Sequence, residues 1–436
     1  MIRSAIKIST AAIVLALIAG IGTVTGQDSE TGDSEDLRQR VERQKPGNTT
    51  FLMRGYAHAG FEFVDDEATF VSGTFAPIFL WRQSDRILFE AEAEIVYTEE
   101  GVDFALEYAN LSYILSDYFV VRFGNFLTPF GIFGERLHPN WINRFPTNPL
   151  GFDHHNPVGP FAEFGVELRG GAPLGDGQFN YALYLSNGPV LQVDTGVDPI
   201  TVNTSYRNIG DNNDNKAIGG RIGVLPFSNS SLELGVSGQY AKIGDRDTGF
   251  EDIASRMYAL DLTYVKNSIS AIKGNIDLKA QWNYVDEDAF QLVGATGTTE
   301  VDNDKSAYFA MLSYRPSLSG SDFLSKIELV GRYSAFNIIN DASFISGGDG
   351  HDHTHRTPEE PVPVISAAGP NAFSEATFGV NASSNSLQQG TDEDTTQWAI
   401  GINYWLTWRS VLKFSYQVTN SESDVPGFFI HYAIGF

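Results

Sequence analysis

Charged residues recur at every second position in several segments of this sequence. Glu90, Glu92 and Glu94 form the densest row, and Asp103 and Glu107 follow shortly after it. Because successive side chains of a strand point to opposite faces, each row gathers on one face. Rings of carboxylate favour cations, and facing rows of acid and base create a transverse field across a wet channel. The charged residues that we expect on such a polar, pore-lining face are Arg86, Glu90, Glu92, Glu94, Asp103, Glu107, Arg122, Glu163, Glu167, Arg169, Asp277, Lys279, Glu328 and Arg332.

A second group of residues with possible chemistry is a His-rich run in which His351, His353 and His355 alternate with Asp352 and Thr354. Imidazole and carboxylate groups are ligands of Zn²⁺, Cu²⁺ and Ni²⁺, so the three histidines are candidate metal ligands. A loop enforces no ligand geometry, and a solvated polar loop is the alternative interpretation. No resident cofactor is predicted. The sequence also lacks a phosphate-binding glycine loop, a G-x-S-x-G elbow and an H-E-x-x-H motif, so we expect no enzymatic activity.

Composition removes further classes of function. The 436 residues carry 29 Lys+Arg against 54 Asp+Glu, a formal net charge of −25, and no cysteine. The absence of cysteine excludes disulfides, thiolate metal sites and a cysteine nucleophile. Nucleic-acid binding needs clustered positive charge, so no nucleic-acid partner is expected. The 43 glycines and the 55 aromatic residues (31 Phe, 18 Tyr and 6 Trp) favour strands and turns over helices.

The first residues resemble an export signal. Arg3 and Lys7 precede an apolar stretch, 8–21, and small residues follow it. We therefore expect a signal peptide over residues 1–26, with an uncleaved anchor as the alternative. Residues 27–50 are then a polar periplasmic tail.

From residue 51 to 436 the chain alternates with period two. In the segment 275–284, polar residues at odd positions alternate with apolar residues at even positions. The predicted strands are longer than those of ordinary sandwiches, and charges recur on the polar face of nearly every one. Their approximate ranges are 51–63, 69–81, 86–97, 102–114, 118–127, 161–170, 178–187, 215–225, 231–243, 254–266, 271–285, 305–315, 323–337, 395–406, 410–420 and 427–436.

The connections between these strands sort into two sets. The first set, beginning with 82–85 and 115–117, is short throughout. The second set contains every long connection, which is typical of outer-membrane barrels with short periplasmic turns and long external loops. The mature chain has no run of eighteen apolar residues, and in hydrocarbon only helices and closed sheets satisfy the backbone. We therefore predict an all-β fold, a transmembrane antiparallel β-barrel of about 16 strands. Its long inserted loops are 128–160, 188–214, 286–304 and 338–394.

The end of the chain fits this prediction. Gly427–Phe436 is amphipathic and closes on Phe436. A terminal Phe on such a strand resembles the signal that the barrel-insertion machinery reads, so this machinery is an expected partner, along with outer-membrane lipid.

The segment from Glu107 to Gly131 resembles part of the phosphate-selective porin O and P family. The matching residues are Tyr113, Gly124, Pro129, Phe130 and Gly131. The resemblance implies a sixteen-stranded porin of the bacterial outer membrane, assembled as a homotrimer. Phosphate selectivity in that family resembles a ladder of Arg and Lys, whereas this chain is strongly acidic. We therefore carry over the porin fold and not the phosphate substrate.

The connection 128–160 is the third external loop, which folds inward and narrows the pore in many porins. Its proline, asparagine, glycine and aromatic residues suit a compact, ordered loop. Packing at the rim or at a subunit contact is the alternative. The constriction candidates are Glu135, Arg136, His138, Arg144, Asp153, His154 and His155.

Taken together, these features predict a porin for passive diffusion of small hydrophilic solutes and ions, with a cation preference. A divalent-metal binding or uptake barrel, loaded through the His-rich loop, is the alternative. A third hypothesis is an outer-membrane hydrolase with catalytic residues on the barrel exterior.

Overall fold

The structure is a computed structural model. It describes residues 50–98, 101–153, 157–194, 201–294, 297–317, 320–339, 393–420 and 424–436. The predicted signal peptide, the tail up to residue 49, and the candidates His154, His155, His351, His353 and His355 lie outside the described residues.

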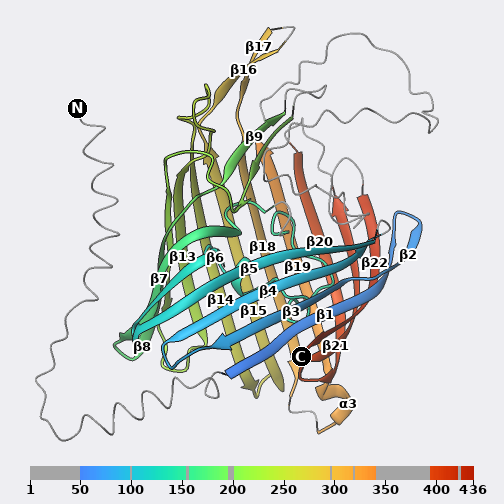
Figure 1. Ribbon diagram of the computed structural model, residues 1–436. Coiled ribbons are helices and arrows are strands. Elements are labelled where there is room, and N and C mark those ends of the chain that lie inside the picture. Colours follow the sequence, from blue (N-terminus) through green and yellow to red (C-terminus); the bar gives the residue numbers. More distant parts are fainter. Residues whose placement is uncertain are drawn as a thin grey trace, which may run out of the picture. The chain divides into compact units, whose positions relative to one another are not determined.

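A closed antiparallel barrel forms the body of the described chain (Figure 1). The main sheet contains 18 strands, of which the short β2 and β11 are additions, so 16 strands make the barrel. Closure comes from β1, which pairs with β3 on one side and with the last strand, β22, on the other. The predicted fold class is therefore confirmed. The barrel strands are β1 (Thr50–Val64), β3 (Thr74–Arg82), β4 (Ile87–Thr98), β5 (Gly101–Ser116), β6 (Phe119–Leu127), β7 (Ala162–Leu174), β8 (Gly177–Ser186), β12 (Ala217–Leu225), β13 (Leu232–Lys242), β14 (Ala254–Ile269), β15 (Gly274–Glu287), β18 (Asp304–Pro316), β19 (Ile327–Ile339), β20 (Glu393–Thr407), β21 (Ser410–Asn420) and β22 (Asp424–Gly435).

The alternation of the sequence determines which face of each strand is exposed. On β20, Trp398 and Ile400 are 62% and 65% exposed, whereas Ala399 and Asn403 are buried. Large apolar side chains are exposed in this way on strands all around the barrel. Such an exterior is stable against lipid, and the closed ladder leaves no unpaired sheet edge in hydrocarbon. Among the described residues, no helix is long and apolar enough to cross a membrane.

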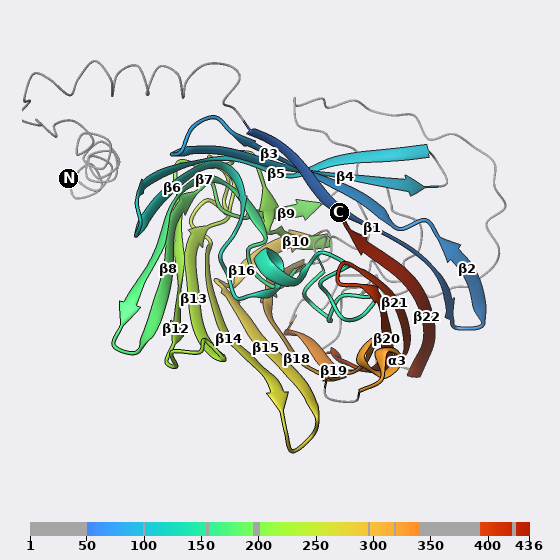
Figure 2. The same cartoon turned by 90° about the horizontal axis from the view of Figure 1, so that it is seen from below.

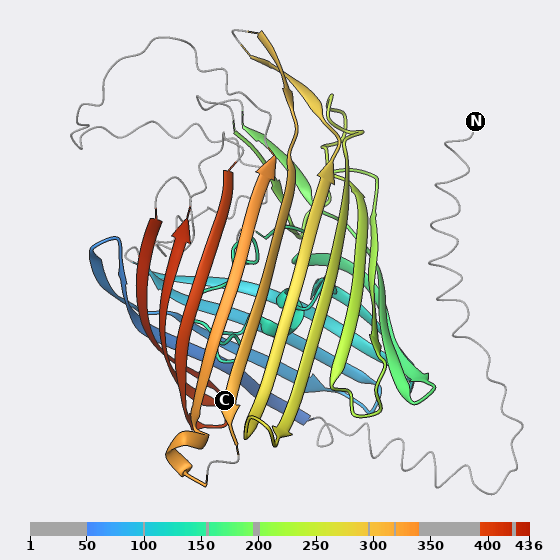
Figure 3. The ribbon, with the colours of Figure 1, turned by 180° about the vertical axis from the view of Figure 1, so that it is seen from behind.

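The two ends of the barrel differ in their connections (Figure 3). The first residues of β1 and the last residues of β22 lie together at one end, which we call the turn end. Short connections join strands there, such as Trp408 and Arg409 between β20 and β21. The opposite end, the loop end, carries the long connections. One predicted strand, 323–337, begins too early, because Asp322–Ser325 forms a helical turn, α3, capped by the Ser321 side chain.

The long connections contain short elements that period-two alternation did not predict. A helical turn of the π type, η1 (Phe133–Leu137), lies in the connection after β6. Small hairpins occur in two other long connections, and a five-residue strand extends the ladder of β1 next to β3. These short strands are β2 (Glu67–Val71), β9 (Val190–Asp194), β10 (Thr201–Ser205), β11 (Arg207–Asn208), β16 (Phe290–Gly294) and β17 (Gly297–Val301).

The largest hydrophobic cluster lies inside the barrel rather than between sheets. Apolar side chains of the segment 128–160 pack on inward side chains of β14, β15, β18, β19 and β20. The aromatic ring of Phe133 lies 5.6 Å from Phe152 and 5.7 Å from Phe309 of β18, measured between centroids. We call this part of the wall the apolar seat; it consists of Met257, Ala259, Val285, Ala307, Phe309, Met311, Val330, Phe336 and Ala399.

Candidate pore and constriction

The segment 128–160, hereafter the constriction loop, folds inside the ring of strands in its described parts, 128–153 and 157–160 (Figure 2). Its first anchor lies on β13 and β15. The backbone N–H of Gly131 donates to Ser237 Oγ at 3.0 Å, and those of Ile132 and Phe133 donate to Gln281 Oε1 at 2.7 and 2.8 Å. These bonds satisfy donors that would otherwise be buried without partners.

Gly131 is required for this approach. Its φ is +65°, a left-handed conformation that residues with a Cβ rarely adopt, and a Cβ there would collide with the Gln281 side chain. The glycine therefore turns the chain from β6 onto the inner wall. It belongs to the Pro129-Phe130-Gly131 stretch that carries the family resemblance.

A second anchor holds the middle of the loop on β19 and β21. Arg332 donates to the Thr147 carbonyl at 2.6 Å and to its hydroxyl at 2.9 Å. Lys413 donates to the carbonyls of Asn143 at 2.6 Å and Phe145 at 3.2 Å. The two cations are 2% and 1% exposed. They therefore fasten the loop and do not face water.

One edge of the loop is charged and meets a cluster of arginines. Glu135 accepts from Arg169 Nη1 at 2.6 Å and Nη2 at 3.1 Å, and from Arg122 Nη2 at 3.2 Å. Burial alone would raise the pKa of Glu135, but Arg169, Arg122 and Arg136 outweigh it and lower the pKa to about 2. The carboxylate is therefore ionised at any physiological pH.

Each guanidinium of this region is matched by carboxylates. Arg136 binds Glu233 at 2.9 Å, and Arg221 binds Glu233 at 3.0 Å and Asp261 at 2.6 Å. We call Arg122, Arg136, Arg169 and Arg221 the arginine cluster. Among the described residues its counter-charges are Glu135, Glu167, Glu233 and Asp261, which number the same as the arginines.

A cavity of about 280 Å³ opens beside the arginine cluster. Arg136, Arg169 and Arg221 line it together with Glu135 and Glu233. Arg136 and Arg169 are the most accessible of these cations, with side chains 37% and 33% exposed. This cavity shows that solvent-sized space borders the charged edge of the loop.

A second charged surface lies on β4 and β5, and we call it the acidic wall: Glu90, Glu92, Glu94, Asp103 and Glu107. The hydrogen-bond donors that contact these carboxylates include neutral hydroxyl groups. Tyr108 donates to Glu90 at 2.9 Å, Tyr56 donates to Glu92 at 2.8 Å, and Thr74 donates to Glu94 at 3.4 Å. Neutral donors stabilise carboxylates without adding positive charge.

A described residue of the loop, His138, adds a titratable base to this wall. His138 Nε2 lies 3.7 Å from Glu92 Oε1, and its ring packs edge-on against Tyr56. Burial works against the imidazolium, yet Glu92 and, more distantly, Glu107 raise the pKa of His138 above 6.5. The loop is thus tied to the acidic wall on the side away from the apolar seat.

The predicted pore-lining residues fall into three groups by their location and burial. Arg86 lies in the exposed turn before β4 rather than on a strand. Half-buried inward positions are Glu90, Glu94, Asp103, Arg169, Asp277 and Lys279. The third group was expected to contact pore water, but neighbouring side chains or the constriction loop bury it. Its members are Glu92, Glu107, Arg122, Glu163, Glu167, Glu328 and Arg332.

The described constriction candidates all lie inside the barrel. Arg144 binds Glu328 at 3.1 Å and Asp277 at 3.4 Å, and Asp153 accepts a hydrogen bond from Asn148 at 3.3 Å. Sequence reasoning missed the neutral anchors Gln281 and Ser237, although both stand on the polar face of their strands. It also missed Arg207, for which the irregular connection 188–214 offers no pattern. The described residues contain no group of three His, Cys, Asp or Glu able to hold a metal ion.

Comparison with solved structures identifies the fold. The anion-selective porin from Comamonas acidovorans aligns with a TM-score of 0.52 and 10% identity, covering 89% of this chain and 100% of that chain. The outer-membrane channel DcaP of Acinetobacter baumannii aligns with a TM-score of 0.52 and 11% identity, covering 90% and 99%. No family model matches the sequence, and no curated protein matches it.

The fold is that of the outer-membrane porins. Its apolar exterior and closed ladder locate the chain in the bacterial outer membrane.

Proposed function

We propose that this protein is a porin through which small hydrophilic solutes and ions diffuse passively, with a preference for cations. The observation that carries the proposal is the unequal compensation of the two charged surfaces. The arginine cluster is matched by an equal number of carboxylates, whereas the acidic wall gathers five carboxylates, three of which accept hydrogen bonds from neutral hydroxyls. This inequality favours a net negative potential along the acidic wall.

The proposal includes an orientation and an assembly. The turn end faces the periplasm and the loop end faces the exterior, since outer-membrane barrels keep their short turns inside. Residues 1–26 are a signal peptide, residues 27–50 a periplasmic tail and residues 51–436 the barrel. The chain assembles as a homotrimer, and Phe436 is read by the insertion machinery. Membership of the phosphate-selective porin O and P family rests on the stretch from Glu107 to Gly131.

Planar-bilayer recording tests this function. The purified protein should give ohmic steps, and a KCl gradient should give a reversal potential on the cation side. A Glu90→Gln, Glu94→Gln, Asp103→Asn variant should lose most of that preference. Asp117→Asn, which removes a carboxylate from the exposed turn between β5 and β6, is the matched control and should retain it. Absence of conductance, or an anion preference of the unmodified protein, would overturn the proposal.

The metal-uptake alternative rests on sequence alone, on His351, His353 and His355. Calorimetric titration of Zn²⁺ into the full chain and into a variant lacking residues 349–355 separates the two functions. Equal heats in both proteins would remove the alternative.

A further inference from the structure

A second connection enters the lumen besides the constriction loop. Between β8 and β12, the segment 204–207 is fixed to two separate parts of the wall. Thr204 and Tyr206 donate to Glu287 of β15 at 2.9 and 3.1 Å. On the other side, the Tyr206 carbonyl accepts from the Phe161 N–H at 3.2 Å, and Arg207 pairs in parallel with the start of β7.

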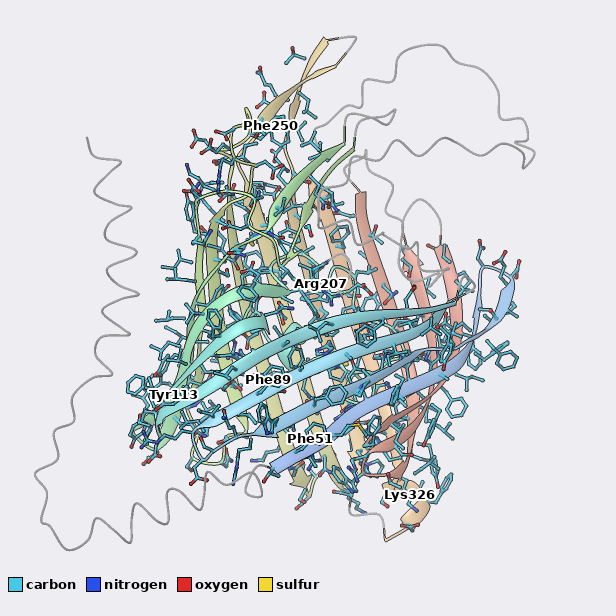
Figure 4. All side chains as sticks on the ribbon, in the orientation of Figure 1. Phe51, Phe89, Tyr113, Arg207, Phe250 and Lys326 are labelled. Atoms are coloured by element: carbon cyan, nitrogen blue, oxygen red, sulfur yellow. The ribbon has the colours of Figure 1, made fainter. Side chains whose placement is uncertain are left out.

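The position of this segment is set by packing as well as by hydrogen bonds. Tyr206 is 3% exposed and belongs to the cluster that joins the constriction loop to the apolar seat. Figure 4 places Arg207 between the level of Phe250 at the loop end and that of Lys326 at the turn end. The backbone that carries Arg207 into the barrel is therefore held in place by packing and hydrogen bonds.

The side chain of Arg207 reaches the acidic wall. Its Nη2 lies 2.5 Å from Glu107 Oε2; the Glu107 side chain is 4% exposed, and that of Arg207 is 25% exposed. Arginine keeps its charge at every accessible pH, unlike His138 beside Glu92. Ion pairs with little solvent contact are weakly screened, so this charge acts on the wall at any salt concentration used in recording.

We propose that Arg207 is a selectivity-determining residue, which sets the strength of the cation preference by cancelling the charge of Glu107. The inference rests on the proposed porin function and adds the residue that limits it. With Arg207 present, the net charge of the wall is less negative by one. Without it, the net charge becomes more negative by one, whatever else contacts the carboxylates.

The test is a double-mutant cycle read by reversal potential in a KCl gradient. Arg207→Gln should shift the potential further toward the cation side, and Glu107→Gln alone should shift it toward the anion side through the uncompensated guanidinium. The combined variant should return close to the unmodified value. Arg207→Lys keeps the charge and should leave selectivity unchanged. Arg82→Gln at the exposed turn end is the matched control and should also leave it unchanged.

The outcomes separate this inference from the proposed function. If the unmodified protein does not conduct, the porin function fails. If it conducts with cation preference and Arg207→Gln leaves the reversal potential unchanged, the role of Arg207 is overturned and the porin function stands. If Arg207→Gln does not fold, a reversal potential of Glu107→Gln that matches the unmodified protein overturns the role instead.

Discussion

The apolar seat and the acidic wall both contact the constriction loop, but they hold it in different ways. On the seat, the aromatic rings of Phe133 and Phe309 pack against each other. The buried cation nearby, Lys413, donates hydrogen bonds to carbonyls of the loop. On the acidic wall, the contact among the described residues is an imidazole beside a carboxylate, His138 and Glu92. The apolar seat fixes the loop, and the acidic wall keeps charged groups at the opposite edge of the loop.

On the proposed porin function, this difference accounts for a stable constriction next to a charged path. Apolar burial provides a large, non-directional stabilisation that does not depend on pH or salt. On the proposed function, the carboxylates of the acidic wall, at the opposite edge of the loop, then act on passing ions. The following variants test this division of roles, in decreasing order of effect.

Removing an aromatic ring from the seat contact should release the loop. Phe133→Ala deletes the ring between Phe152 and Phe309, and such deletions cost about 3–5 kcal/mol. We expect larger, noisier single-channel currents and new protease cleavage within the segment 128–160. Phe250→Ala, which breaks the aromatic contact with Phe290 at the loop end, should leave the currents unchanged. Quiet currents of the original size in Phe133→Ala would contradict the role of the seat.

Removing a buried cation should weaken the same attachment less. Lys413→Met leaves the carbonyls of Asn143 and Phe145 unpaired, at a cost of about 1–3 kcal/mol. The thermal unfolding midpoint in detergent should fall. Lys326→Met breaks only the exposed pair with Asp322 and should change the midpoint little. An equal fall in both variants would show that Lys413 is no anchor.

Neutralising the loop edge should change selectivity without releasing the loop. Glu135→Gln leaves Arg169 and Arg122 undercompensated, so the reversal potential should move toward the anion side. Because the pKa of Glu135 is lowered from 4.5 to about 2, its stabilising contribution is complete above pH 4.5 and disappears as pH falls through about 2. The unmodified protein should therefore show no loss of this ion pair between pH 5 and pH 8. A shift of the variant toward the cation side would contradict the assignment.

Titration of the loop histidine should give the smallest effect. The pKa of His138 is raised above 6.5 by Glu92 on β4 and Glu107 on β5, with Tyr56 of β1 also against the ring. Its stabilising contribution is complete below pH 6.5 and is lost as pH rises through the raised pKa. Cation preference should therefore increase as the imidazolium deprotonates. His138→Gln should abolish that step, and a step of unchanged size in this variant would assign the titration elsewhere.

The fold was predictable because one physical rule, apolar outside and polar inside, applies to every residue of a membrane-spanning strand. Most predicted strands match the observed ones within a few residues. One exception, 323–337, arises where a helix cap, Ser321, overrides alternation at the start of β19. Another, 69–81, is divided in the structure between the end of β2 and β3. The small hairpins of the connections 188–214 and 286–304 have no such rule, since they lie outside the lipid.

The candidate site was predictable only in part. Alternation indicates which charges point inward, but it does not indicate which of them the loop then covers. Arg332 and Lys279 look alike in sequence, yet Arg332 lies beneath Thr147 and Lys279 remains half-buried. Neutral residues such as Gln281 anchor the loop through geometry that only the folded chain provides.

On the proposed function, ions pass along the acidic wall and not along the apolar seat. The natural chain has no cysteine, so single cysteines can be introduced and modified during bilayer recording. With Asp103→Cys, a positively charged methanethiosulfonate reagent should change the current stepwise and reduce cation preference. With Met311→Cys on the seat, the same reagent should have no effect. Modification of the Met311→Cys variant together with an inert Asp103→Cys variant would contradict the account.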